Sequence, residues 1–474
     1  MHIDSKKLIN LYKFLSGKEP DSLVRIPDSG SYRQYFRITG VNGTVIGVYN
    51  GDDRENQAFL SFTKHFRSEG LPVPEILAEK REDHCYLLTD LGDETLFSRL
   101  ALRRNEQDEF PPEVVILYKK VLDWLPLFQI KAGKGIDYSK CYPRGAFDRQ
   151  SMLWDLNYFK YYFLKLARVP FDEQKLEDDF QSLTGYLLSV DPAYFMYRDF
   201  QSRNVMLVED EPWFIDYQGG RKGALQYDLA SLLYDAKADI PQEIREELLD
   251  YYINILGNYV TIDPEQFIKY YYGFVLIRIL QALGAYGFRG YYENKPLFLQ
   301  SIPYALKNLH FLIETRKIPE GLPMLKEVLQ RMIADRKFRE KTRPAGDLTV
   351  TIFSFSYKNG IPVDEKGNGG GYVFDCRALP NPGRYPEYQL MTGKDLSVTG
   401  FLKKEPAVDQ FLNHVFSLVD QSVDTYVERG FSHLMVSFGC TGGQHRSVYC
   451  SEQLATHLKE RFMVRIRIIH RELQ

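Results

Sequence analysis

The stretch that decides the fold reads Tyr197-Arg198-Asp199-Phe200-Gln201-Ser202-Arg203-Asn204, and Phe214-Ile215-Asp216-Tyr217-Gln218-Gly219 follows it. Asp199 and Asn204 are five residues apart, and Asp216 comes twelve residues after Asn204. A loop that presents a carboxylate base and an amide oxygen, beside a strand that supplies a second carboxylate, can bracket a phosphate-bound metal ion. We predict that Asp199 accepts the proton of an acceptor hydroxyl while Asn204 and Asp216 hold Mg²⁺.

Asp and Asn are also ordinary turn residues, so a purely structural interpretation has to be weighed. The run Asp228-Leu229-Ala230-Ser231-Leu232-Leu233 follows in the right order and favours the chemical interpretation. With Tyr86-Leu87-Leu88-Thr89-Asp90-Leu91-Gly92, these motifs make residues 20–315 resemble the aminoglycoside phosphotransferase superfamily. Within that superfamily, the chain looks most like the branch of the N-acetylmuramate/N-acetylglucosamine anomeric kinases.

The resemblance implies an ATP- and Mg²⁺-dependent kinase for a small molecule. By position, Asp199 is then the base, Arg198 braces its loop, and Asn204 and Asp216 are the metal ligands. Asp90 and Leu91 fall in the hinge, where backbone groups receive adenine. Ser29, Gly30, Ser31 and Tyr32 form the turn over the phosphates, and Glu55 is the helix carboxylate near them.

Two features depart from the usual kinase pattern. The turn Asp28-Ser29-Gly30-Ser31-Tyr32-Arg33-Gln34 has one glycine and no GxGxxG, so a plain hairpin is an equally good interpretation. The third strand, Ile46-Gly47-Val48-Tyr49, has Tyr49 where the nucleotide-binding lysine is expected. Glu55 would then lack its usual partner, and a weak or inactive kinase is an alternative.

The order of the predicted elements gives the fold class. Residues 1–90 read as a small antiparallel sheet with one helix, at 53–69, and residues 91–332 as a helical lobe interrupted by the β-rich stretch 195–217. This is an α+β, bilobal, protein-kinase-like domain. The charged stretch 333–347 contains Pro344 and Gly346 and is the expected linker. Residues 348–474 alternate strands with helices, which indicates a small α/β domain with a mostly parallel sheet.

A second chemical motif lies in that domain. Residues 433–447 read HLMVSFGCTGGQHRS, an apolar strand that runs into a glycine-rich loop and then a helix. Such a loop aims backbone N–H groups at one place and favours an anion there, and Arg446 adds a guanidinium. Cys440 and Arg446 also fit Cys-x₅-Arg-Ser, in which a cysteine thiolate attacks phosphorus. A tight strand–helix turn without chemistry is the third interpretation.

We favour the binding site, because residues 348–474 resemble the C-terminal domain of the RapZ family. The matching motifs are Phe374-Asp375-Cys376-Arg377-Ala378-Leu379-Pro380-Asn381-Pro382, Leu390-Met391-Thr392-Gly393-Lys394-Asp395 and the segment 439–452. The resemblance implies a sensor of glucosamine 6-phosphate, which in some bacteria also serves as an adaptor for small RNA. The expected ligand-binding residues are Asp375, Arg377, Cys440, Thr441, Gly442, Gly443, Gln444, His445, Arg446 and Ser447.

Composition sets the remaining bounds. The 474 residues carry a net charge of −3, and the chain ends in a short, mixed segment, so we do not expect RNA binding. The five cysteines show no CxxC pairing, and no run of 18 apolar residues occurs, which favours a cytoplasmic location without membrane contact. The expected function is an amino-sugar kinase with a sugar-phosphate sensor; the alternatives are a regulatory adaptor with a weak kinase fold, and a kinase with a cysteine phosphatase domain.

Overall fold

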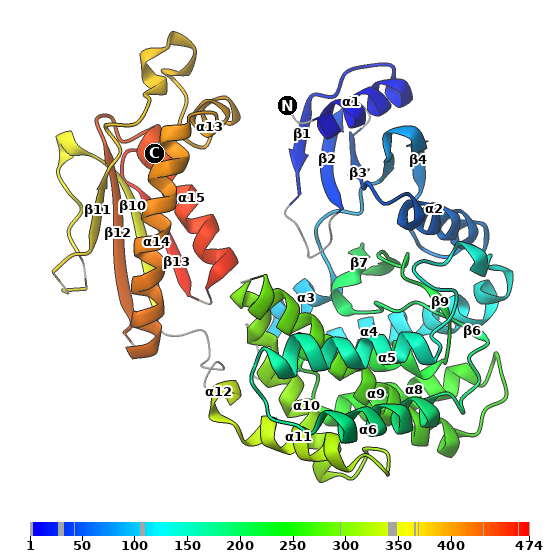
Figure 1. Cartoon of the computed structure of the whole chain (residues 1–474). Coiled ribbons are helices and arrows are strands. Elements are labelled where there is room, and N and C mark those ends of the chain that lie inside the picture. Colours follow the sequence, from blue (N-terminus) through cyan, green and yellow to red (C-terminus); the bar gives the residue numbers. More distant parts are fainter. Residues whose placement is uncertain are drawn as a thin grey trace. The chain divides into compact units, whose positions relative to one another are not determined.

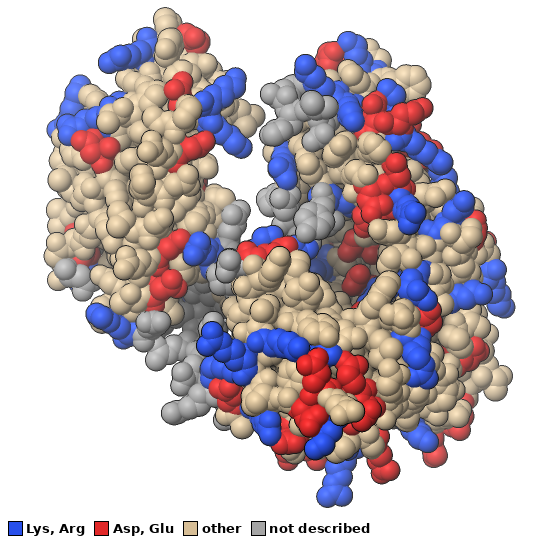
Figure 2. All heavy atoms as spheres, in the orientation of Figure 1, with Lys and Arg blue, Asp and Glu red and all other residues tan. Residues whose placement is uncertain are grey.

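A computed structural model describes residues 3–26, 33–41, 43–104, 110–293, 295–339, 348–364, 366–367, 369–429, 431–462 and 464–473. The chain divides into two compact units, one of Met1–Tyr292 with Ser301–Asp335 and the other of Glu293–Gln300 with Arg336–Gln474 (Figure 1). Basic and acidic side chains are interspersed over the face seen in Figure 2, as the small net charge leads one to expect. Among the described residues, no helix is long and apolar enough to cross a bilayer.

The first unit begins with an antiparallel sheet whose strands follow the order β1-β2-β3-β5-β4. One face of this sheet packs on helix α1 through an apolar cluster that includes Leu8, Phe36 and Ile38. Helix α2 starts at a capping residue, Asp52, whose carboxylate accepts the backbone N–H groups of Arg54 and Glu55. The bounds are α1 Ile3–Ser16, β1 Ser22–Arg25, β2 Gln34–Gly40, β3 Gly43–Tyr49, α2 Asp53–Ser68, β4 Ile76–Lys80 and β5 Cys85–Thr89.

The rest of the first unit is helical and carries two small antiparallel two-stranded sheets, β7 with β8 and β6 with β9. All eight residues of helix α7 are buried, and 14 of the 24 residues of helix α9 are buried. The bounds are α3 Leu96–Arg104, α4 Pro112–Pro126, α5 Arg149–Tyr158, α6 Glu173–Leu187, β6 Tyr194–Met196, β7 Val205–Val208, β8 Glu211–Phe214, β9 Arg221–Gly223, α7 Gln226–Leu233, α8 Gln242–Leu256, α9 Pro264–Gly287, α10 Ile302–Glu314 and α11 Pro323–Ala334.

A column of aromatic rings joins the sheet lobe to the helical lobe. The Phe59 ring on α2 stacks on Tyr86 of β5, with centroids 5.2 Å apart, and on Tyr217, at 5.3 Å. Tyr217 in turn meets Tyr197 edge to face at 5.9 Å, and its hydroxyl lies 2.7 Å from Thr63 Oγ1. Because Tyr197 and Tyr217 are the immediate neighbours of Arg198 and Asp216, this column places the two chemical loops against α2.

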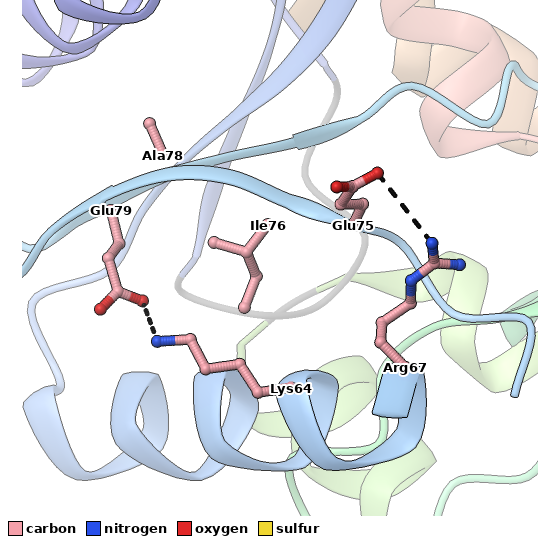
Figure 3. A pocket seen from close by; sticks show the side chains of 6 residues that line it. All are labelled: Lys64, Arg67, Glu75, Ile76, Ala78 and Glu79. Carbon is pink, nitrogen blue, oxygen red and sulfur yellow. Dashed lines mark hydrogen bonds and ion pairs between the residues drawn. The ribbon is translucent and has the colours of Figure 1, made fainter. Parts of the chain in front are cut away.

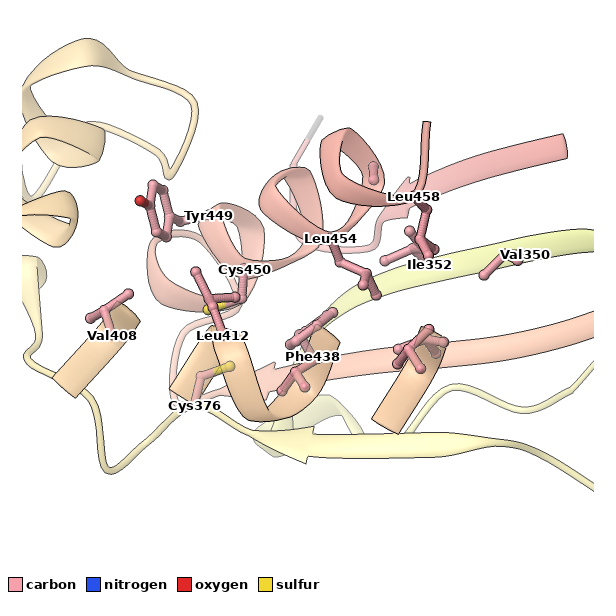
Figure 4. Packing of buried hydrophobic residues seen from close by; sticks show 14 of the residues in the cluster. Val350, Ile352, Cys376, Val408, Leu412, Phe438, Tyr449, Cys450, Leu454 and Leu458 are labelled. Atoms are coloured by element: carbon pink, nitrogen blue, oxygen red, sulfur yellow. The ribbon is translucent and has the colours of Figure 1, made fainter. Parts of the chain in front are cut away.

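The second unit is built on a four-stranded, all-parallel sheet in the order β11-β12-β10-β13. Its apolar core lies between the sheet and the helices, and includes Val350, Phe438, Cys450 and Leu454 (Figure 4). The bounds are α12 Arg336–Arg339, β10 Thr349–Ser356, β11 Tyr372–Asp375, α13 Leu396–Lys403, α14 Pro406–Arg429, β12 His433–Cys440, α15 Arg446–Arg461 and β13 Arg465–His470.

The sequence-based fold class is confirmed for both units, but elements were missed, among them strand β4 and helix α1, the latter because a single helix was expected within residues 1–90. Strand β4 has no alternation of buried and exposed residues, since four of its five side chains are half-buried and the fifth is exposed. Its sequence, ILAEK, therefore carries no strand period, and only its pairing with β5 defines it. The four residues Phe59, Phe62, Thr63 and Phe66, expected on one face of the second helix, are all buried.

The ring column predicts a steep cost for removing its central ring. Phe59→Ala should destabilise the first unit by about 3–5 kcal/mol, because it leaves a cavity between two stacked rings. Phe14→Ala is the matched control, since Phe14 is 86% exposed and should change little. Calorimetric unfolding of both variants checks this, and equal melting temperatures would contradict the role given to the column.

Candidate active site

The three residues singled out by spacing meet in the first unit. The Asn204 side-chain N–H₂ donates to the backbone carbonyl of Asp199 at 2.9 Å and to Asp216 Oδ2 at 3.2 Å. The other oxygen of Asp216 accepts from Gln218 Nε2 at 2.7 Å. Asn204 therefore links the two carboxylate-bearing loops, and its own Oδ1 is left as an acceptor.

Both loops carry a residue in the left-handed region of backbone space. Arg198 has φ +84° and Asp216 has φ +70°, conformations that cost free energy for residues with a Cβ. Strain of this kind persists only where the surrounding structure over-determines it, and it gathers at functional sites. The two strained residues lie directly before Asp199 and at the second carboxylate itself.

A buried carboxylate on α7, Asp228, holds the first loop in place. Its Oδ2 accepts the backbone N–H of Tyr197 at 2.9 Å and Gln129 Nε2 at 3.0 Å, and its Oδ1 accepts the N–H of Arg198 at 3.0 Å. Burial raises the pKa of Asp228 to about 6, while these N–H bonds act in the opposite direction. The strained turn before Asp199 is thus fixed by side-chain acceptors from another helix.

The Arg198 side chain points into the helical lobe, away from the reacting position. Its Nη2 donates to Asp155 Oδ1 of α5 at 2.6 Å, and its guanidinium lies over the rings of Phe147 and Tyr227. The Asp199 side chain is 42% exposed, and Nη2 of Arg278 on α9 lies 4.0 Å from Asp199 Oδ1. Arg198 is consequently a positioning residue, and Asp199 is open to a ligand.

The electrostatics of the cluster suit a divalent cation. Burial raises the pKa of Asp216, and the nearby Asp199 carboxylate raises it further, because each negative charge disfavours the other. The described residues contain no group of three or more His, Cys, Asp or Glu side chains that could enclose a metal. Two carboxylates and an amide oxygen are instead a partial set of hard ligands, of the kind that Mg²⁺ completes with phosphate oxygens and water.

The expectation that Glu55 would lack a partner is wrong. Glu55 Oε1 lies 3.2 Å from Arg33 Nη2, and Glu55 Oε2 accepts Asn50 Nδ2 at 2.8 Å. Tyr49 does not face this site. It packs against the apolar cluster under α1, and Lys7 Nζ lies over its ring, 5.3 Å from the centroid. The residue beside Glu55 at the end of the third strand is Asn50, one position beyond the expected place.

The predicted nucleotide contacts are described in part. Asp90 and Leu91 directly follow β5, and Arg37 Nε pairs with Asp90 Oδ2 at 2.7 Å. Burial alone would raise the pKa of Asp90, but Arg37 and the Gly92 N–H lower it below its ordinary value. The Asp90 carboxylate is therefore engaged by Arg37 and by the backbone. Ser29, Gly30, Ser31 and Tyr32 lie outside the described residues.

A surface cavity of about 410 Å³ lies between α2 and β4, away from this chemistry (Figure 3). Its charged residues pair with one another, Lys64 with Glu79 at 2.9 Å and Arg67 with Glu75 at 4.0 Å. None of the residues of the Asp199 cluster lines it. The charged walls of this cavity therefore neutralise each other.

In the second unit, the glycine-rich loop follows β12 at the edge where all four parallel strands end. Parallel sheets commonly bind ligands in this position. Cys440 Sγ accepts the Gly443 N–H at 3.2 Å and lies 3.2 Å from Ser447 Oγ, and Ser356 Oγ donates to the Thr441 carbonyl at 2.7 Å. Gly443 has φ +72°, so the loop needs its glycine there. Thr441, Gly442 and Gln444 are exposed, and His445 is half-buried.

The charged residues beside this loop are largely engaged with each other or with the backbone. Arg446 Nη1 donates to the carbonyls of Arg377 at 2.8 Å and Leu379 at 3.0 Å, so this edge of the guanidinium fastens the neighbouring loop. His445 Nε2 lies 2.8 Å from the Tyr388 carbonyl. Arg377 forms a two-pronged pair with Asp375 and lies over the Tyr357 ring. Both Asp375 and Arg377 are exposed and within reach of a ligand.

Sequence models of two known families match this chain. The sequence model described as "Phosphotransferase enzyme family" matches residues 22–265, more than half of the chain. The chain belongs to the phosphotransferase enzyme family. The model described as "RapZ C-terminal domain" matches residues 348–474. The kinase-like fold and the RapZ-type domain expected from the motifs are therefore confirmed.

Individual relatives match parts of the chain. A "nucleotide-binding protein" of Nitrosomonas eutropha is 40% identical over 138 residues, which cover 29% of this chain and 46% of that protein. One of Thermotoga neapolitana is 36% identical over 150 residues, 32% of this chain and 48% of that protein. The chain thus spans about half the length of these curated relatives.

Among solved structures, choline kinase from Streptococcus pneumoniae matches with 16% identity and a TM-score of 0.41, over 65% of this chain and 99% of that one. An ethanolamine kinase of Plasmodium vivax matches with 12% identity and a TM-score of 0.47, over 66% and 88%.

Sequence reasoning gave no role to three residues of this site: Asp155, Asp228 and Arg33. Asp155 pairs with Arg198 from 43 positions away, and no local motif marks it. Asp228 was noticed only as part of a matching run, although it fixes the loop. Arg33 was visible in the turn, but its pairing with Glu55 depends on strand register.

The anchoring role of Asp228 gives a prediction. Asp228→Asn puts an amide N–H₂ against backbone N–H donors, so we expect a loss of about 1–3 kcal/mol of stability in the first unit together with loss of turnover. Asp178→Asn, which removes the charge of an exposed carboxylate on α6, is the matched control. Urea unfolding and any phosphoryl-transfer assay check this; an Asn variant with unchanged stability would contradict the anchor.

Proposed function

We propose that the chain is an ATP- and Mg²⁺-dependent kinase that phosphorylates a hydroxyl of an amino sugar, and that its second unit binds a sugar phosphate. The observation that carries the kinase proposal is the meeting of Asp199, Asn204 and Asp216 on two strained loops. Phosphoryl transfer demands mainly positioning and charge stabilisation, which such a rigid set provides.

Each residue has a separate task in this proposal. Asp199 accepts the proton of the acceptor hydroxyl, because it is exposed and its loop is fixed by Asp228. Asn204 Oδ1 and Asp216 would hold Mg²⁺, which when bound neutralises charge on the phosphates. Gln218 orients Asp216 through a 2.7 Å hydrogen bond. Arg198 keeps the loop seated by its pair with Asp155.

The proposal of an amino-sugar acceptor rests on the combination of the two units in one chain. The first unit resembles kinases of N-acetylated amino sugars, and the second matches the RapZ C-terminal domain, which the resemblance connects with glucosamine 6-phosphate. A kinase and a sensor for chemically related sugars on one chain support an amino sugar over choline or an aminoglycoside. An adaptor without turnover is the second candidate, favoured by the absence of a lysine from β3.

For the second unit, the geometry supports binding over phosphatase chemistry. Cys440 is only 2% exposed and its sulfur already accepts an N–H from the loop. One edge of Arg446 is committed to carbonyl groups, whereas a phosphatase needs that guanidinium on the transferring phosphate. The exposed loop and the start of α15 still offer backbone N–H groups to an anion.

Loss of the base should separate binding from chemistry. Asp199→Asn should lower turnover at least ~10²-fold while nucleotide affinity stays nearly the same, because general bases contribute about that much. The assay is ADP release over a panel of free sugars, amino sugars, choline and aminoglycosides, with Asp178→Asn as the control. Unchanged turnover would remove Asp199 from this role, and no ADP release with any acceptor would favour the adaptor.

Loss of the proposed metal ligand should lower nucleotide affinity as well as turnover. Asp216→Ala should weaken binding of the Mg²⁺–nucleotide complex, because it deletes the buried carboxylate of the metal set, and turnover should fall with it. Titration with and without Mg²⁺ measures this. Equal affinity of wild type and variant in Mg²⁺ would show that Asp216 is no ligand.

Cys440→Ser distinguishes the two interpretations of the anion loop. Serine keeps a small polar group beside Gly443 but is a far weaker nucleophile than a thiolate, so a sensor should retain its affinity for glucosamine 6-phosphate. Neither form should release phosphate from p-nitrophenyl phosphate. A wild-type burst of p-nitrophenol that the variant loses would establish a cysteine phosphatase instead.

A further inference from the structure

The phosphate end of the kinase site has no cation on its third strand. In β3 and the residue after it, the chain reads Gly43-Thr44-Val45-Ile46-Gly47-Val48-Tyr49-Asn50, without lysine or arginine. Tyr49 faces the apolar cluster under α1. Asn50 is 5% exposed and its Nδ2 reaches Glu55, which a lysine would otherwise pair with. The neutral amide of Asn50 thus lies at the end of the third strand, where kinases usually place a positive charge near the triphosphate.

The charge is supplied from the neighbouring strand. The β2–β3 ladder pairs Gln34 with Tyr49, so one step further the register puts Arg33 opposite Asn50. Residues directly opposite in a ladder lie on the same face of the sheet. Arg33 Nη2 is 3.2 Å from Glu55 Oε1, so the cation and Asn50 converge on one carboxylate.

Arg33, the residue directly before β2, continues the face of that strand that looks away from α1. Phe36 and Ile38 pack in the cluster under α1, so the alternation along the strand puts Arg33 and Arg37 on the opposite face. Arg37 confirms this by reaching Asp90 after β5. Arg33 therefore lies at one end, and the nucleotide hinge at the other end, of the same strand face.

The ring column holds this guanidinium in a fixed place. The Arg33 guanidinium carbon lies 5.6 Å from the centroid of Phe59, the ring that stacks on Tyr217 beside Asp216. Its side chain is only 1% exposed. Burial would lower the pKa of Arg33, but the surrounding phenols, Glu55 and Asp216 raise it above its ordinary value, so the group stays charged.

We propose that Arg33 is the phosphate-binding cation of this kinase, transferred from the third strand to the second and braced by Glu55, with Asn50 as its neutral neighbour. The inference rests on the proposed kinase function and adds a residue to it. A guanidinium has five N–H donors in a planar fork, so it can hold a carboxylate on one edge and a phosphate oxygen on another. On this account the missing lysine does not imply an inactive kinase.

The test compares a triphosphate with a ligand that has no phosphate. Calorimetric titration of the full chain with adenylyl imidodiphosphate and Mg²⁺ should show a loss of affinity of about 10- to 100-fold in Arg33→Ala, the range expected for a charged hydrogen bond. Adenosine should bind wild type and variant equally. Arg54→Ala, which removes an exposed guanidinium next to Glu55, is the matched control and should bind both ligands normally.

Two further variants separate charge from packing. Arg33→Lys should keep most of the triphosphate affinity and Arg33→Gln should lose it, because only lysine keeps the charge. In an Arg33→Ala background, Asn50→Lys should restore a large part of the affinity by returning the cation to the third strand.

The outcomes are distinguishable. Normal triphosphate binding by Arg33→Ala and Arg33→Gln, or an equal loss for adenosine and triphosphate, would overturn the inference and leave Arg33 a structural brace, with the proposed kinase function intact. Failure of the wild type to bind any nucleotide would overturn the proposed function and this inference with it.

Discussion

The site depends on one buried carboxylate, Asp228, which accepts two consecutive backbone N–H groups from another part of the chain. Those bonds hold Arg198 in a left-handed conformation that it would not adopt alone, and the next residue is the proposed base. The position of Asp199 is therefore set by α7 and by the Arg198–Asp155 pair, rather than by its own loop. Strain at Arg198 is sustained because both its backbone and its side chain have fixed partners.

A chain of contacts leads from the Asp199 loop, which Asp228 anchors, to the proposed metal ligands and then to the sheet lobe. Asn204 ties the Asp199 loop to Asp216, and Tyr217 after Asp216 stacks on Phe59 of α2. The same helix presents Glu55, which meets Arg33 and Asn50 at the end of the β2–β3 ladder. Helix α2 thus links Arg33, the proposed phosphate-binding cation, with Tyr217, the neighbour of the proposed metal ligand Asp216.

The sequence predicted what is local and missed what depends on register or distant contacts. Asp199, Asn204 and Asp216 could be found because a short loop and a hairpin fix their spacing. The strands and helices of the second unit could be found because runs such as His433–Cys440 are apolar and end at glycines. Asp155 and Asp228 could not be given roles, since their partners lie 43 and about 30 residues away. Glu55 was predicted to lack a partner because a cation was sought on the third strand alone, whereas Arg33 comes from the second.

The central claim is that the pair of loops around Asp199 and Asp216 holds a nucleotide-bound metal. The most direct measurement is the anomalous X-ray signal of Mn²⁺ in crystals grown with a non-hydrolysable ATP analogue. The account predicts a metal peak at about 2 Å from Asp216 and from Asn204 Oδ1, with the terminal phosphate directed at Asp199. A nucleotide bound elsewhere, or bound with no metal at these two residues, would contradict it.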